Sequence, residues 1–487
     1  MSTAKVQVKW QSQMFDDVEV DHSGTMELLN AQLFALTNVP TDRQKVMLKG
    51  KILKTNQDLA RITDGSRLVL MGTADQIVAA PEQAVVFLED LTDSQKANLG
   101  TAEAPCGLIN LGNTCYLNSA ITCFRSIPEL KENLISYGNG GDVTRFSGPQ
   151  DSSSNQVVAK LGQMLFSLDN SVEAVAPIAF LSAFREAFPQ FAQRSNAGYS
   201  QQDADESLTQ LLYTLREVLK KFPDESDISG NSGINGLFVG QMESTITCNE
   251  LPDDQKAANV EVKMHEFSKL SCHISGDTNH LSDGLTAALS ESIEKHSPIL
   301  TRNAIFTKVD RIAQLPPYLI VQFVRFFWKK DTQKKAKIMR KVVFPFRLDV
   351  LQYCTPQLQK ELTAYRDNEE KKFAEMEAEK EKQPLEFLTK NDVEKNGKPA
   401  PVETPNPRLY TKSGVYELFA LITHKGRAAD SGHYIGWAKG KNKGEWFQYD
   451  DNVVTKQTED DIQKLVGGGD WHMAYVCFYR AAPWRTA

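Results

Sequence analysis

The residue of this sequence most suited to nucleophilic chemistry is Cys115, which follows a run rich in glycine and asparagine at residues 107–113. Apolar side chains then recur at intervals of three and four residues, which predicts an amphipathic helix with one buried face: Leu117, Ala120, Ile121 and Phe124. Asn113 or Thr114 is expected to cap this helix by accepting from its first free N–H groups. Cys115 would then lie in the first turn, where the helix dipole favours the nucleophilic thiolate.

Two interpretations of Cys115 compete. Free cysteines are among the most buried residues, so a structural role is the simpler one, and Cys123 in the middle of the predicted helix fits it. A catalytic role gains support from Asn110, upstream of Cys115, whose side-chain amide could donate to a developing oxyanion. The residues around Cys115 favour the nucleophile.

A candidate general base, His433, lies in one of two predicted strands that flank the turn KGKNKG. If this hairpin is centred just before Asn442, His433 directly opposes Asp450, and their Cβ atoms lie about 5 Å apart. A centre at Asn442 would bring Asp451 opposite His433 and turn Asp450 to the other face of the sheet. Spacing alone leaves both acids open.

Two other histidines compete with His433 for the role of base. His424 precedes a glycine-containing loop and could line a cleft, but no acid opposes it in the predicted sheet. His472 follows three consecutive glycines and is expected to be structural. His433 is therefore the predicted base.

Length and composition limit the class of protein. A chain of 487 residues is too long for one ordinary core, so two or three folded units are expected. The hydrophobic share of 41% and the charged share of 24% are typical of a soluble globular protein. The net charge of −7 gives no reason to expect binding to nucleic acid or to a membrane surface. We expect no secretory signal and no membrane span.

The cysteine pattern favours a reducing compartment over a disulfide framework. The seven cysteines are odd in number, scattered, and contain no C-x-x-C pair. A site built from Cys248, Cys272 and His273 lacks the paired spacing of a zinc site. We therefore predict no structural metal and no cofactor.

The order of predicted elements divides the chain into two domains of α+β character. Residues 1–75 read strand, strand, helix, strand, strand, which is the β-grasp plan of ubiquitin, and residues 76–104 read as a linker. Residues 105–482 begin with helical patterns and turn to strands in their second half. A densely charged insertion at about residues 360–408 is expected to be partly an exposed helix and otherwise mobile.

Three stretches carry a family resemblance: GLINLGNTCYLNS, AGYSQQDADES and the region around SGHYIGWAK. They resemble the Cys, Gln-Gln-Asp and His boxes of the ubiquitin-specific proteases, papain-like cysteine proteases in which a helical half faces an antiparallel sheet. The resemblance implies a thiol-dependent deubiquitinase that cleaves after the Gly-Gly tail of ubiquitin without metal or organic cofactor.

The same resemblance implies roles for individual residues. Cys115 would be the nucleophile and His433 the base, the first acid of the pair, Asp450, would orient His433, and Asn110 would donate to the oxyanion. Residues expected to hold the ubiquitin tail are Gln201, Asp203 and Tyr434. For Asp203, capping of the helix that follows is an alternative, and the two roles can coexist.

The ubiquitin-like start is similar to that of the proteasome-associated members of this family. This implies docking on the regulatory particle of the 26S proteasome, ubiquitinated proteins as partners, a location in cytoplasm and nucleus, and a monomer when free. Residues 329–340 and 426–432 match surface loops that cover the tail channel in such proteins. A mainly non-catalytic scaffold that regulates proteasomes is the alternative, and a protease for another Gly-Gly-tailed modifier is a third.

Overall fold

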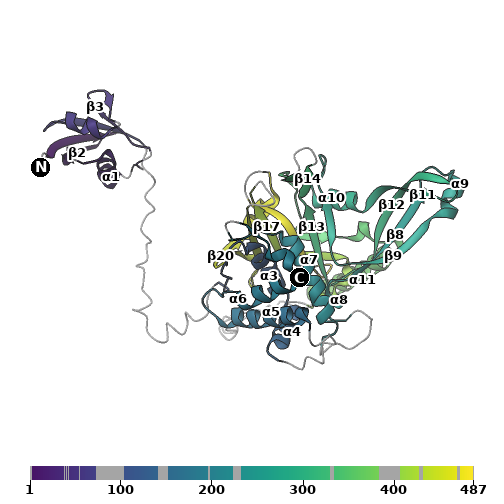
Figure 1. Cartoon of the computed structure of the whole chain (residues 1–487). Coiled ribbons are helices and arrows are strands. Elements are labelled where there is room, and N and C mark those ends of the chain that lie inside the picture. Colours follow the sequence, from purple (N-terminus) through teal and green to yellow (C-terminus); the bar gives the residue numbers. More distant parts are fainter. Residues whose placement is uncertain are drawn as a thin grey trace. The chain divides into compact units, whose positions relative to one another are not determined.

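The computed structural model shows two compact units, residues 1–101 and 102–487 (Figure 1). It describes residues 3–72 apart from 12, 23, 38, 40, 42 and 54, then 104–140, 152–222 apart from 196–197, 232–329, 334–382, 406–426, 432–468 and 472–485. The predicted linker, residues 76–104, lies outside the described residues except for Ala104. Among the described residues, no helix has the length and apolar character needed to cross a bilayer.

The first unit has the predicted β-grasp fold. Its five-stranded sheet has the order β2-β1-β5-β3-β4, with β1 and β5 parallel at the centre. Alternate strand residues such as Val6, Val8, Leu68 and Leu70 meet Leu29 and Leu33 of the helix in one core. The elements are β1 Thr3–Trp10, β2 Gln13–Asp21, α1 Met26–Thr37, β3 Lys45–Leu48, β4 Lys51–Ile52 and β5 Arg67–Met71.

The second unit begins with helices, as predicted. They are α3 Cys115–Arg125, α4 Pro128–Gly138, α5 Ser153–Asn170, α6 Ile178–Ala187, α7 Ala204–Val218 and α8 Asn235–Phe238. Helix α3 is buried on every side from its first residue to Phe124, not only along the predicted stripe. The reason is its position, because α3 packs against α4 and α7 and also against the strand β18.

An eight-stranded sheet supports the helices. Its order is β10-β13-β21-β17-β18-β19-β20, and β16 pairs with β17. Alternate residues of its central strands belong to two separate cores, so both faces are covered. The strands are β10 Leu270–His273, β13 Tyr318–Val324, β16 Arg347–Asp349, β17 Val415–Lys425, β18 His433–Lys439, β19 Glu445–Asp450, β20 Val453–Thr458 and β21 Met473–Ala481.

A four-stranded sheet extends to one side of this helix–sheet pair (Figure 1). It has the order β11-β12-β8-β9 and its own small core of five buried residues. Its strands are β8 Gly240–Cys248, β9 Glu261–Phe267, β11 Ser290–Ser297 and β12 Arg302–Gln314. The others are β6 Arg194–Ser195, β7 Gly198–Tyr199, α9 Asp253–Lys256, α10 Leu281–Ala288, β14 Phe326–Lys329, β15 Lys334–Lys337, α11 Pro356–Lys382 and α13 Glu459–Gln463.

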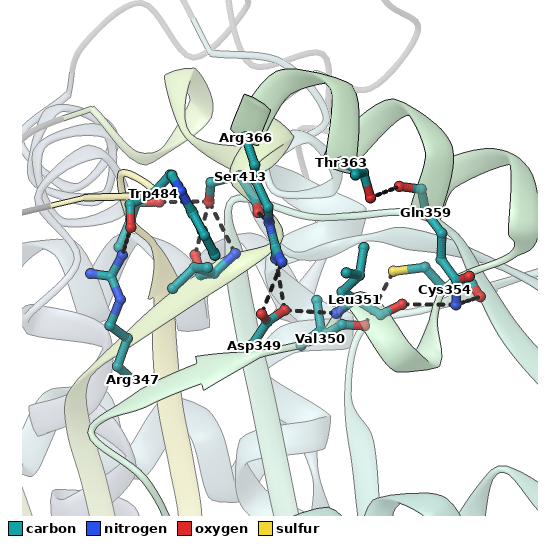
Figure 2. A network of polar contacts seen from close by, with 12 residues as sticks. Arg347, Asp349, Val350, Leu351, Cys354, Gln359, Thr363, Arg366, Ser413 and Trp484 are labelled. Atoms are coloured by element: carbon teal, nitrogen blue, oxygen red, sulfur yellow. Dashed lines mark hydrogen bonds and ion pairs between the residues drawn. The ribbon is translucent and has the colours of Figure 1, made fainter. Parts of the chain in front are cut away.

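The start of the predicted charged insertion is helix α11, and a buried arginine fixes it to the sheet (Figure 2). Arg366 donates to both carboxylate oxygens of Asp349, at 2.7 and 3.0 Å, and to the carbonyl of Ser413 at 2.7 Å. Its guanidinium also lies 4.3 Å from the ring centre of Trp484. This helix is therefore anchored at its first half, and residues 383–405 lie outside the described residues.

Candidate active site

The side chain of Asn110 organises the turn before Cys115. Its Oδ1 accepts from the backbone N–H groups of Gly112 and Thr114 at 3.0 and 3.2 Å, and from the Thr114 hydroxyl at 3.2 Å. The Thr114 hydroxyl in turn accepts from the backbone N–H of Leu111 at 3.0 Å. The chain is thereby folded into a compact turn from which α3 starts at Cys115.

The predicted side-chain cap of this helix is wrong. Thr114 is the N-cap residue, but no side-chain hydrogen bond caps the helix, because the Thr114 hydroxyl is engaged with the turn. Asn113 has a φ of 56° and donates its amide to the carbonyl of Tyr199 at 2.8 Å. Cys115, 2% exposed, therefore begins a helix whose first N–H groups receive no side-chain acceptor.

His433 and Asp450 meet, as predicted, although in a different register. His433 Nε2 donates to Asp450 Oδ1 at 2.5 Å. The strands pair from Gly436 with Tyr449 onward, which centres the hairpin one residue later than expected, just after Asn442. Continuing this register places Asp450 diagonally across from His433, and a two-residue shift keeps both side chains on one face of the sheet.

His433 also bonds to Cys115. This hydrogen bond raises the pKa of His433 to about 9; burial opposes the shift, and the hydrogen bond that the ring donates to Asp450 adds to it. Because Asp450 engages Nε2, Nδ1 is the ring nitrogen left for the thiol. An imidazolium in this place stabilises negative charge on the neighbouring sulfur.

Asp451, the acid that spacing left open, has a different environment. It is 9% exposed, and with a φ of 53° its backbone leaves the extended conformation just after the end of β19. Its two oxygens accept from the side-chain amides of Asn110 and Asn118, both at 2.8 Å, and one of them lies 3.9 Å from His433 Nε2. Asp451 thus joins the turn before Cys115 to the end of β19.

Asn110 lies next to the site, but part of its donor capacity is already used. One of its two amide N–H groups donates to Asp451. Among the described residues, these contacts give the other N–H group no acceptor. Its predicted role as oxyanion donor stays a prediction.

Two of the three predicted tail-binding residues, Asp203 and Tyr434, contact one tyrosine, Tyr475. Asp203 caps α7 by accepting from the backbone N–H groups of Asp205 and Glu206 at 2.7 and 3.3 Å, so the alternative structural role is real. Asp203 also accepts from the Tyr475 hydroxyl at 2.8 and 2.9 Å, and the Tyr475 ring lies 5.9 Å from that of Tyr434.

Gln201 lies two residues before Asp203 in the sequence. Its Nε2 is buried and has no hydrogen-bond partner in the part of the chain that the structure describes. A buried amide left in this state costs free energy, and an incoming acceptor would recover it. The arrangement is compatible with the predicted contact to an extended peptide.

Two residues of the site escaped sequence reasoning. They are Phe326 and Tyr475, whose ring centres lie 5.3 Å apart, and the Phe326 ring also lies 5.4 Å from that of His424. Phe326 belongs to none of the quoted motifs, and the two residues lie on strands far apart in the sequence. Their only signal was that each is an aromatic residue on a predicted strand of the sheet that carries His433.

The competing histidines are unsuited to act as base. Burial, and after it the charge of Lys337, lowers the pKa of His424 to about 3. Burial, and after it the charge of Lys425, lowers the pKa of His472 to about 4. Both rings stay neutral near neutral pH and have little affinity for a proton.

Among the described residues, one group of side chains is close enough together to hold a metal ion, and it consists of His433, Asp450 and Asp451. These groups are already bonded to one another and to Asn110 and Asn118. All seven cysteines are buried free thiols.

The two stretches predicted to cover a channel are described in part. Residues 329–340 include strand β15, while residues 330–333 lie outside the described residues. Within 426–432, only Gly426 and Gly432 are described.

Comparison with known proteins identifies both units. Residues 106–479 match the family model "Ubiquitin carboxyl-terminal hydrolase", and residues 6–75 match the "Ubiquitin family" model. The chain is similar to ubiquitin carboxyl-terminal hydrolase 6 of Arabidopsis thaliana, with 43% identity and 98% of each chain covered. It is 32% identical to ubiquitin carboxyl-terminal hydrolase 14 of Caenorhabditis elegans, over 98% of this chain and 93% of that one.

A solved structure, "Structure of the SAGA Ubp8/Sgf11/Sus1/Sgf73 DUB module bound to ubiquitin aldehyde", shares the fold. Its TM-score is 0.50 at 19% identity, over 77% of this chain and 69% of that chain. The relatives match both units of this chain, and the family match spans the helices and the sheet that hold Cys115 and His433. The chain therefore belongs to the ubiquitin carboxyl-terminal hydrolase family and is a papain-like cysteine-type deubiquitinase with an N-terminal ubiquitin-like domain.

Proposed function

We propose that Cys115, His433 and Asp450 hydrolyse the peptide or isopeptide bond after the C-terminal Gly-Gly of ubiquitin, on substrates held at the proteasome. The observation that carries the catalytic part is the position of His433, which bonds to Cys115 on one side and to Asp450 on the other. A nucleophile, a base and an orienting acid in this order are the elements of acyl transfer.

The proposed reaction begins with attack of the Cys115 sulfur on the carbonyl carbon. His433 takes up the proton of the attacking thiol, and its raised pKa of about 9 favours the charged ring. His433 then gives this proton to the leaving lysine amine as the tetrahedral intermediate collapses to a thioester. Water, deprotonated by the now neutral ring, hydrolyses the thioester and releases the ubiquitin carboxylate.

The oxyanion of each tetrahedral intermediate needs donors. The free N–H of the Asn110 amide and the backbone N–H of Cys115 at the start of α3 are the groups proposed here. Asp451 holds the Asn110 amide in place through its 2.8 Å hydrogen bond. Loss of one such donor typically costs about 3 kcal/mol of barrier.

The ubiquitin-like domain is proposed to dock on the regulatory particle of the proteasome. It offers an apolar surface for this purpose, because Val69, Met47 and Ile52 are paired across β5, β3 and β4 and share one face of the sheet. Val69 is 37% exposed and Ile52 44% exposed. Contiguous exposed apolar side chains are typical of protein-interaction surfaces. Trimming of ubiquitin from engaged substrates, and a location in cytoplasm and nucleus, follow from this docking.

A test of both parts uses the full chain and a ubiquitin–fluorophore substrate, with and without purified proteasomes. We expect hydrolysis that Cys115→Ala abolishes, and co-purification with proteasomes that Val69→Asp reduces about tenfold. Leu28→Asp, at an exposed apolar residue of α1, serves as the matched control. No hydrolysis in the presence of proteasomes would contradict the catalytic part, and unchanged co-purification of Val69→Asp would contradict the docking surface.

A mainly non-catalytic regulator of the proteasome is the second candidate, favoured by the separate ubiquitin-like unit. It predicts that Cys115→Ala keeps most of the effect of the wild type on substrate degradation. The catalytic proposal predicts that this variant leaves ubiquitin attached to proteasome-bound substrates.

A further inference from the structure

Lys337, the last residue of β15, is a buried lysine that the proposed mechanism does not use. It is 8% exposed, and its Nζ donates to His424 Nδ1 at 2.7 Å. The same ammonium donates to the carbonyl oxygens of His424 and Gly426, at 2.9 and 3.0 Å. Three neutral acceptors thus surround the charge, and all belong to the end of β17 and the residues that follow it.

The contact with Lys337 determines where His424 carries its proton. An ammonium group has only donors, so Nδ1 of His424 must accept and the ring proton must lie on Nε2. Burial, and after it the charge of Lys337, lowers the pKa of His424 to about 3, so the ring stays neutral. His424 therefore presents a neutral Nε2–H.

The His424 ring lies beside one of the predicted tail-binding residues, Tyr434. Nε2 is buried and has no hydrogen-bond partner in the described part of the chain. A Cβ on Gly432, the residue before His433, would lie only 2.5 Å from it, so the absence of a side chain there keeps the nitrogen clear. The ring itself lies 4.6 Å from that of Tyr434.

The hairpin that carries Lys337 is fixed at its base. Arg325, fully buried just before β14, donates to the carbonyl oxygens of Ile338 and Arg340 at 3.1 and 2.9 Å. It also donates to the carbonyl of Ala474 in β21 at 2.8 Å. Lys337 is thereby held against β17 by a rigid connection, which suits a residue whose task is to orient another.

We propose that Lys337 is a positioning residue that keeps the proton of His424 on Nε2, so that His424 donates a hydrogen bond to a backbone carbonyl of the bound ubiquitin tail. An extended peptide presents such carbonyls, and satisfying a buried donor favours its binding. The identity of the peptide rests on the proposed function; the position of the proton does not.

Lys337→Met tests the proposal, because methionine keeps an unbranched side chain and removes the charge and the donors. Lys464→Met is the matched control, since Lys464 is an exposed lysine paired with Asp461. In the wild type, ¹⁵N-labelled histidine should show His424 with a protonated Nε2 and an unprotonated Nδ1. In Lys337→Met we expect a mixture of the two tautomers, and in Lys464→Met the wild-type spectrum.

Kinetics with the ubiquitin–fluorophore substrate and proteasomes give a second readout. Lys337→Met should raise KM about tenfold and leave kcat within about threefold, because the lost contact holds the tail in ground state and transition state alike. His424→Phe should do the same, and the double variant should lose no more than either single one, since Lys337 acts through His424.

Three results would overturn the proposal: a proton on Nδ1 in the wild type, an unchanged KM for Lys337→Met, or fully additive losses in the double variant. A wild type that hydrolyses no ubiquitin substrate would refute the proposed function instead. In that case the histidine spectra still decide whether Lys337 sets the tautomer.

Discussion

His424 and His433 lie on neighbouring strands of one sheet, yet they have opposite proton affinities. A hydrogen bond with Cys115 and another with Asp450 raise the pKa of His433 to about 9. Burial and the Lys337 ammonium lower the pKa of His424 to about 3. At His424 burial is the larger cause and the charge of Lys337 adds to it. At His433 the hydrogen bonds with Cys115 and Asp450 outweigh the opposing effect of burial.

This comparison also separates two tasks within the site. A ring that must hold and release a proton is placed between a thiol and a carboxylate. A ring that must only donate one hydrogen bond is kept neutral by burial and by a neighbouring cation. The same residue type therefore serves as base on β18 and, in our proposal, as a fixed donor on β17.

The largest expected effect is that of His433→Gln. Glutamine cannot take a proton from Cys115, so kcat for the ubiquitin–fluorophore substrate should fall at least about 10³-fold. His424→Phe should change mainly KM. Equal losses of kcat in the two variants would remove the functional distinction between the histidines.

Asp450→Asn should lower kcat about 10²-fold, because the ring loses the acceptor that orients it and stabilises its charged form. The pKa of His433, followed by NMR titration, should also decrease. Asp451→Asn leaves the bond between His433 and Asp450 in place and disturbs the amides of Asn110 and Asn118. A larger fall of the His433 pKa in the second variant than in the first would show that Asp451 is the orienting acid.

Gly432 lies between the two histidines in the sequence. Gly432→Ala should lower kcat/KM about tenfold. The φ of Gly432 is 143°, and a Cβ there would approach the Lys425 carbonyl at 2.3 Å and His424 Nε2 at 2.5 Å. The added methyl group must therefore displace His424, His433 or both. Activity equal to the wild type would show that this backbone position tolerates a side chain.

The smallest expected effects are on the pH dependence of the free energy of unfolding. His433 has a pKa raised above the unfolded value of about 6.5. Its stabilisation is therefore complete below that pH and is lost as pH rises toward about 9. His424 has a lowered pKa, so the unfolded chain binds a proton that the folded chain refuses, and stability falls as pH decreases from about 6.5 toward 3.

Urea unfolding at several pH values would measure both slopes. His433→Gln should flatten the decline on the alkaline side, and His424→Phe should flatten the one on the acidic side. The reverse assignment of the two slopes would contradict the contrast between the histidines.

Sequence reasoning found the parts of the site that short-range patterns encode. Helical periodicity after a turn placed Cys115 at a helix start, and the family resemblance selected it as the nucleophile. Strand spacing left Asp450 and Asp451 both open as the partner of His433, and the resemblance favoured Asp450. The register was wrong by two residues, yet an even shift preserves the face, so the contact survived the error. The expected cap failed because Asn110 accepts from Thr114 within the turn.

The rest depends on contacts between distant segments. Lys337 and His424 meet only because β15 and β17 are folded together, and nothing in either local pattern indicates their contact. Asp451 accepts a hydrogen bond from Asn118, although 333 positions separate the two residues in the sequence. The sequence predicted an exposed helix at the start of the charged insertion. It did not indicate the anchor, because Arg366 contacts Asp349 and Trp484 only in the folded state.

The most direct test of the central claim is reaction with a ubiquitin whose C-terminus carries an electrophile, with and without proteasomes. We expect a covalent adduct whose peptide map places ubiquitin on Cys115, and no adduct in Cys115→Ala. Because His433 supports the reactive sulfur, His433→Gln should react far more slowly, whereas His424→Phe should still reach full labelling at high probe concentration. An adduct on any other cysteine, or no adduct even with proteasomes present, would contradict this claim.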